Sequence, residues 1–160
     1  MNETLQNGPP QASWERVVNA HQAFHDSLAH FLQDKDQRVA ALRQVLRSGD
    51  RLLALSAAQH LELEEKKQLL PEWAHLARCA HGPFSWAWNM ILSLPRDWVL
   101  EHLPTEVDAI LGKEEWDDYW MFLQLYLKLD PSLTKNLADR AAKHSDPDIR
   151  ELGEEYLQKA

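Results

Sequence analysis

Apolar residues recur at intervals of three and four along most of the chain, which predicts helices. Hairpin dipeptides and sustained apolar–polar alternation are nearly absent, so we expect an all-α fold. The first predicted helix begins at Trp14 with Ser13 as its cap. We expect its apolar stripe to face the core. The stripe consists of Trp14, Val18, His21, His25, Leu28 and Leu32, with Val17, Phe24 and Phe31 beside it.

Small residues follow the predicted helices at regular intervals along the chain. They are Gly49, Gly82, Gly112 and Ser145, spaced by 33, 30 and 33 residues. A glycine after a helix favours the left-handed conformation that ends it. Pro71 and Pro104 are also 33 residues apart, and each is expected to begin or kink the later helix of its unit. A period in the thirties is typical of stacked helical hairpins.

This recurrence predicts four units and a closing helix. The units span about 14–48, 50–81, 83–111 and 114–144, and the closing helix spans 147–158. We expect a disordered tail over residues 1–12 and a single helical-repeat domain over residues 13–160. The closing helix has one strongly polar face, as expected for the cap of a solenoid. That face carries Glu151, Glu154, Glu155 and Lys159.

The segment Asp146-Pro147-Asp148-Ile149-Arg150-Glu151-Leu152 resembles the opening of a HEAT-like repeat, in which an Asp turn precedes an aliphatic–Arg pair. The segments starting at Asp36 and at Gly49 match more loosely, so the resemblance covers about residues 34–159. It implies a short right-handed α–α superhelix of about four antiparallel helix pairs plus a C-terminal capping helix. Such folds mostly serve as binding surfaces, and the resemblance implies no catalytic residues.

Composition narrows the function. The 160 residues suit one domain. The net charge of −8 argues against a general nucleic-acid binder, including a relative of the alkylpurine glycosylases, which grip DNA with a basic concave face. The single Cys79 excludes an internal disulfide and a multi-cysteine zinc cluster. The chain has no apolar run long enough for a transmembrane helix and no secretory signal pattern, so we expect a cytoplasmic protein without membrane contact.

Most of the negative charge lies in one block. Nine acidic residues between Asp97 and Asp130 face only two lysines, which gives 2 − 9 = −7. Four of them crowd the first turn of one helix, which is more than capping requires. They are either steering groups for a basic partner or the soluble end of a helix over a Trp-rich core. The predicted partner-binding residues are Glu114, Glu115, Trp116, Asp117, Asp118, Tyr119, Trp120 and Asp108.

Other chemistry-bearing residues favour structural roles. His21 and His25 have the spacing of two metal ligands, but nothing nearby completes a set. Glu72 and His75 match half of a di-iron motif that lacks its second half. His75 and Cys79 have the spacing of a thiolate–imidazole pair, but the sequence around them has no motif for an oxyanion hole. We therefore expect no catalytic residues, no metal and no cofactor. A basic series is either a docking patch or a solvated face with ion pairs: Lys35, Arg38, Arg43, Arg47 and Arg51.

These observations favour a non-enzymatic protein–protein interaction module that binds a basic partner. A special case is an immunity protein or inhibitor that neutralises a toxin such as a basic nuclease. The alternative is an intracellular adaptor that binds a peptide or helix in a concave apolar groove, anchored by Trp86, Trp88 and Tyr119. An enzyme that uses the His75–Cys79 pair or a metal at His21 and His25 is the third hypothesis.

Overall fold

The computed structural model describes residues 10–79, 82, 84–112 and 115–159. Within these residues the chain forms ten α-helices and no strand, which confirms the predicted all-α class. The helices are α1 (Pro10–Gln33), α2 (Arg38–Ser48), α3 (Arg51–Ala58), α4 (Leu63–Gln68), α5 (Leu70–Ala77), α6 (Phe84–Leu92), α7 (Arg96–Leu111), α8 (Trp116–Leu129), α9 (Pro131–Ala141) and α10 (Pro147–Leu157).

The chain divides into two compact units, Met1–Arg38 and Val39–Ala160. The first contains α1, which begins at Pro10 and not at Trp14 as predicted. Proline suits the first turn of a helix because its fixed φ is helical and no backbone N–H is needed there. The predicted disordered tail lies largely outside the described residues, since the description begins at residue 10.

The apolar stripe of α1 is exposed, so the expectation that it faces the core is wrong. Trp14 is 66% exposed, and Val17, Val18 and Phe24 are also exposed. The physical reason is that α1 is the only helix of its unit among the described residues, so no second helix of that unit covers it. Amphipathic spacing predicts a helix but does not identify what packs on its apolar face.

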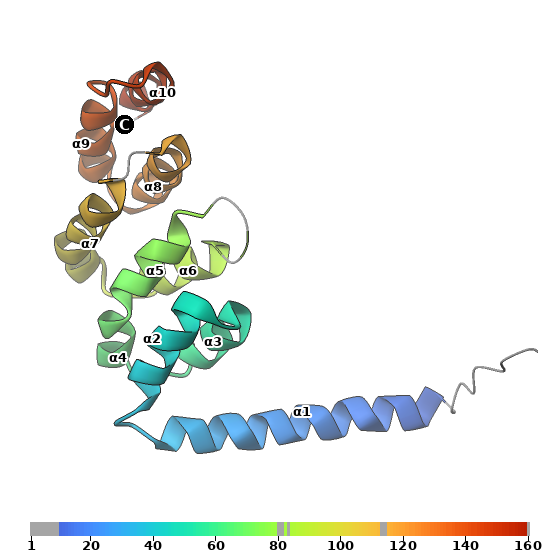
Figure 1. The fold of residues 1–160 in the computed structure, drawn as a ribbon. Helices are drawn as coiled ribbons and strands as arrows, with labels where there is room; N and C mark the ends of the chain where they lie inside the picture. The colour runs from blue at the N-terminus through green and yellow to red at the C-terminus, as the bar shows by residue number, and fades with distance from the viewer. Residues whose placement is uncertain (1–9, 80–81, 83, 113–114, 160) are drawn as a thin grey trace, which may run out of the picture. The chain divides into compact units, whose positions relative to one another are not determined.

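In the second unit, helices pack mainly against their neighbours in the chain. Helix α5 contacts α4, α6 and α7, and α8 contacts α7, α9 and α10. Helices α8, α9 and α10 lie together at the C-terminal end of this unit (Figure 1). The predicted unit over 50–81 contains a third, short helix, α4, which begins with a capping box between Glu62 and Glu65.

Helix α8 lies at the centre of this C-terminal group. Its sequence is apolar on nearly every side, which predicts neighbours on most sides. Eight of its fourteen residues are buried, including Tyr119 and Phe122 at 0% exposure. The prediction is therefore confirmed. The exposed positions of α8 lie at its two ends, Trp116 and Asp117 in the first turn and Leu127 and Lys128 in the last.

Aspartates, more than glycines, mark the helix boundaries. Only Gly82 among the described glycines has a positive φ, of 94°. Gly112 has a right-handed φ of −63°, so the predicted left-handed termination is wrong there and also at Gly49. Aspartate side chains cap the helices that follow, because their carboxylates accept backbone N–H groups that have no helical partner. The capping residues are Asp50, Asp130 and Asp146.

Pro71 lies in the first turn of α5, as predicted, whereas Pro104 lies inside α7 and does not begin it.

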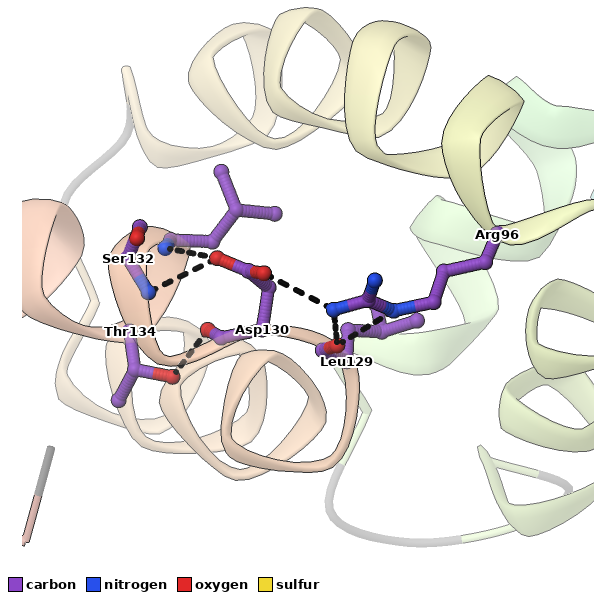
Figure 2. A network of polar contacts seen from close by, with 6 residues as sticks. Arg96, Leu129, Asp130, Ser132 and Thr134 are labelled. Atoms are coloured by element: carbon purple, nitrogen blue, oxygen red, sulfur yellow. Dashed lines mark hydrogen bonds and ion pairs between the residues drawn. The ribbon is translucent and has the colours of Figure 1, made fainter.

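The turn from α8 to α9 is held by a polar network (Figure 2). Asp130 Oδ1 accepts the backbone N–H groups of Ser132 at 2.8 Å and Leu133 at 3.2 Å. Arg96, the first residue of α7, donates to Asp130 Oδ2 at 2.9 Å and to the Leu129 carbonyl. The Asp130 carboxylate thus caps α9 and also links the α8–α9 turn to the start of α7.

We expect Asp130→Ala to lower the free energy of unfolding by about 1–2 kcal/mol, because α9 loses its cap and Arg96 loses an anion. Urea unfolding followed by circular dichroism measures this loss. Lys135→Ala, at an exposed position of the same helix, is the control and should change the stability by less than about 0.5 kcal/mol. Equal effects of the two substitutions would contradict the structural role of the network.

Gly153 lets α10 lie directly against the backbone of α9. A Cβ atom at this position would stand 2.3 Å from the Ala142 nitrogen and 2.7 Å from the Ala138 carbonyl oxygen. Such distances are shorter than any van der Waals contact, and a backbone cannot move aside as a flexible side chain does. Glycine is therefore required by the close approach of two helices, although it weakens an isolated helix.

We expect Gly153→Ala to destabilise the protein by about 1–3 kcal/mol, because the clash with α9 outweighs the gain in helix propensity. Glu154→Ala, the exposed neighbour, brings a better helix former without a clash and should be close to neutral. The midpoints of urea unfolding compare the two. A Gly153→Ala protein as stable as the wild type would show that α10 does not depend on this contact.

Candidate protein-binding surface

The first turn of α8 exposes an aromatic pair. Glu115 precedes the helix in an extended conformation, and Trp116 is its first residue. The rings of Trp116 and Trp120 stack with their centroids 6.0 Å apart and their planes 11° from parallel. Trp116 is 41% exposed and Trp120 is half-buried. The stack fixes the orientation of an exposed indole, which lowers the conformational entropy that the ring would lose on binding.

Trp116 borders a cleft of about 340 Å³ between the start of α8 and α10. The other residues that line the cleft come from one face of α10, because they are spaced by three and four residues. One is Leu152, which is only 5% exposed, and three are carboxylates: Asp148, Glu151 and Glu155. The cleft therefore combines an aromatic face with negative charge.

Most carboxylates around the cleft are not neutralised by any residue that the structure describes. Glu115, Asp117, Asp148 and Glu151 form no ion pair with any residue that the structure describes. Glu155 differs, because the Lys159 ammonium pairs with it and lies 4.5 Å from the centroid of the Tyr156 ring. The surface around Trp116 thus has a local excess of negative charge.

Two predicted contact residues lie beneath the surface, so their assignment to a directly contacted surface is wrong. Asp118 is 3% exposed and Tyr119 is fully buried. Asp118 pairs with Arg78 at 3.1 Å, and the Tyr119 ring meets His144 edge-on at 5.6 Å. The helical period explains this result, because residues 118 and 119 point to the neighbouring helices while 116 and 117 point outward.

Asp118 is a costly group to bury. Burial raises the pKa of its carboxyl group above the ordinary value, and the Arg78 guanidinium opposes that shift. The charges of Glu115 and Asp117 raise the pKa further. Asp118 is therefore better explained as the link between α8 and the end of α5 than as a steering group.

The remaining predicted residues divide by their environment. Asp108 is exposed, but it pairs with Arg140 at 2.7 Å, and that guanidinium also lies 5.9 Å from the centroid of the Tyr119 ring. Its charge is thus compensated within the chain. Glu114 lies outside the described residues. Glu115, Trp116, Asp117 and Trp120 are brought together at the first turn of α8.

The basic series does not form a free patch. Arg47 pairs with Glu72 Oε1 at 2.6 Å, and Arg43 lies 3.5 Å from the same atom and donates to the Gln68 carbonyl. These contacts tie α2 to α5. Arg38 is buried and donates to the carbonyl of Leu32. Ion pairs from α2 to Glu72 of α5 therefore account for Arg43 and Arg47.

The other candidates for chemistry also have structural contacts. His21 and His25 share a hydrogen bond of 3.0 Å on the exposed face of α1. The Cys79 thiol contacts the backbone carbonyl of His75 at 3.8 Å. Among the described residues, no group of three or more His, Cys, Asp or Glu side chains has the geometry to hold a metal ion.

Sequence reasoning missed the α10 side of the cleft. Glu151 and Glu155 are noted in the sequence as the polar face of a capping helix, and Asp148 as part of a repeat opening. The missing information was that this face lies beside Trp116. Gly153 was the available signal, because a glycine inside a helix often marks a close approach to another backbone.

The raised pKa of Asp118 predicts how stability depends on pH. Because the folded state binds the proton more tightly than the unfolded state, this carboxyl group favours folding most at low pH. Its contribution is lost as pH rises from the ordinary carboxyl value through the raised one. We expect Asp118→Asn to remove this part of the pH dependence of the free energy of unfolding, measured by urea unfolding at a series of pH values.

At neutral pH, Asp118→Asn should cost less than about 1 kcal/mol, whereas Arg78→Ala should cost about 2–3 kcal/mol because it leaves a buried carboxylate without its cation. The reverse order would contradict the description of Asp118 as a group that is costly to bury.

Comparisons with family models, curated proteins and solved structures found no match to this chain. No helix of the described residues combines the length and the apolar character needed to cross a bilayer.

Proposed function

We propose that this protein is a non-enzymatic interaction module that binds a basic protein through the surface around Trp116. The observation that carries the proposal is the cleft at which this exposed indole meets the carboxylates of α10. Aromatic residues that are partly exposed and held in place are frequent anchors of protein interfaces. The surrounding carboxylates supply long-range attraction for a positively charged partner.

The negative charge of this surface also favours rapid association with a basic partner. Uncompensated carboxylates on one surface raise the association rate with a basic partner, and salt screens that effect. Four carboxylates form no ion pair with a described residue. Glu115 and Asp117 flank Trp116 in the chain, and Asp148 and Glu151 line the cleft with it. An inhibitor that covers the active site of a basic toxin or nuclease is the form of this function in which rapid capture matters most.

The adaptor alternative has less support. Of its three anchors, Tyr119 is buried and Trp88 donates its indole N–H to the Ala77 carbonyl at 3.1 Å. Trp86 is 40% exposed and borders a hollow of about 270 Å³. Most of the other residues that line this hollow are polar: Gln59, Lys66, Asn89, Met90 and Ser93. This arrangement does not favour an apolar peptide groove.

The test compares two variants with the same change of charge. Asp117→Lys/Glu151→Lys reverses charge beside Trp116, and Glu64→Lys/Glu101→Lys does so at exposed positions of α4 and α7. Proteins captured from native lysate by the immobilised wild type are identified by mass spectrometry. The association rate of the most enriched one is then measured against salt concentration with all three chains.

We expect a basic partner whose association with the Asp117→Lys/Glu151→Lys variant is at least about tenfold slower, with a weaker salt dependence. The control variant should lose much less. A partner that is acidic, or one that associates equally with both variants, would overturn the proposal.

A further inference from the structure

The cleft beside Trp116 has the size and polarity of a pocket for one side chain. Its volume of about 340 Å³ is near the lower end of the range of about 300–1,000 Å³ found for small-molecule sites. The described residues that line it are one aromatic ring, three carboxylates and one largely buried aliphatic side chain, and none of these is basic. An occupant that complements this lining has an apolar stem and a positively charged end.

The arrangement of the carboxylates favours an ammonium over a guanidinium. Asp148, Glu151 and Glu155 lie on successive turns of α10 and approach the cleft from different heights. A lysine ammonium is a compact charge with three donors that point in different directions. An arginine fork instead requires a single carboxylate presented side-on for two parallel hydrogen bonds. The methylene groups of a lysine also match the exposed apolar surface of Trp116.

The chain itself already holds an ammonium in this way. Lys159 pairs with Glu155 while its charge lies over the Tyr156 ring. The hydrogen bond to Glu155 raises the pKa of the Lys159 ammonium, so the pair favours the charged form. The same helix thus binds a lysine between a carboxylate and an aromatic ring at its C-terminal end, and Asp148 and Glu151 pair with no cation among the described residues.

We propose that the cleft between α8 and α10 binds a single lysine side chain of the partner protein, with the ammonium between Asp148 and Glu151 and over the Trp116 ring. This inference rests on the proposed function, because it names the group of the basic partner that the surface recognises. The surrounding carboxylates, Glu115 and Asp117, attract the partner without selecting a particular side chain.

The experiment titrates short capped peptides into the full-length, isotope-labelled chain and follows the indole N–H signal of Trp116 by NMR. Four peptides share an alanine frame and differ only at the central residue, which is lysine, arginine, acetyl-lysine or norleucine. We expect the lysine peptide to shift the Trp116 signal at concentrations at least about tenfold lower than the arginine peptide requires. Acetyl-lysine and norleucine remove the charge and should give no saturable shift.

A matched pair of variants locates the site. Glu151→Gln removes a carboxylate that lines the cleft, and Glu154→Gln makes the same change at an exposed position of α10 outside it. We expect Glu151→Gln to weaken lysine-peptide binding about tenfold and Glu154→Gln to leave it nearly unchanged. Both positions are exposed, so unfolding curves should show that both variants fold.

Three results would overturn the lysine pocket. They are equal binding of the arginine peptide, no saturable shift with the lysine peptide, and equal effects of Glu151→Gln and Glu154→Gln. If one of these is observed while charge reversal at Asp117 and Glu151 still slows association of the basic partner, the proposed function stands and only the pocket is rejected. If charge reversal also has no effect, both proposals are rejected.

Discussion

The contact between Gly153 and the backbone of α9 is the constraint on which the candidate surface depends. Because no side chain separates the two helices, α10 lies close enough to α9 for Ile149, Leu152 and Tyr156 to be buried. The adjacent face of α10, which Leu152 borders, then presents its carboxylates beside the first turn of α8. A larger residue at 153 would move this whole row of charges, since a helix shifts as a rigid body.

Much of the fold can be predicted from the sequence because local rules decide it. The spacing of apolar residues identifies the helices, and the aspartate that precedes Pro131 or Pro147 marks where a helix begins. The apolar sequence of α8 likewise predicts a covered helix. Helix ends were less predictable, because Gly112 continues in the right-handed conformation although glycine also permits the left-handed one.

The candidate surface was only partly predictable because it depends on which faces meet. The sequence places Trp116 among acidic residues, but it does not tell which of them point outward. Asp118 is drawn inward by Arg78, forty residues earlier in the chain, and no local pattern contains that pairing. The carboxylates of the cleft come from α10, at least thirty residues after Trp116 in the sequence. Helical periodicity and composition therefore predict that the surface is acidic, but they do not predict which residues form it.

The pairing of Lys159 with Glu155 has a consequence for modification of the protein. With Lys159 charged, the three carboxylates of the cleft and this ammonium sum to 1 − 3 = −2. Acetylation removes the charge of a lysine, so the same group of residues would then carry −3. The side chain of Lys159 is 44% exposed. A modification near the C-terminus would thus strengthen the attraction of the cleft for cations without altering any residue that lines it.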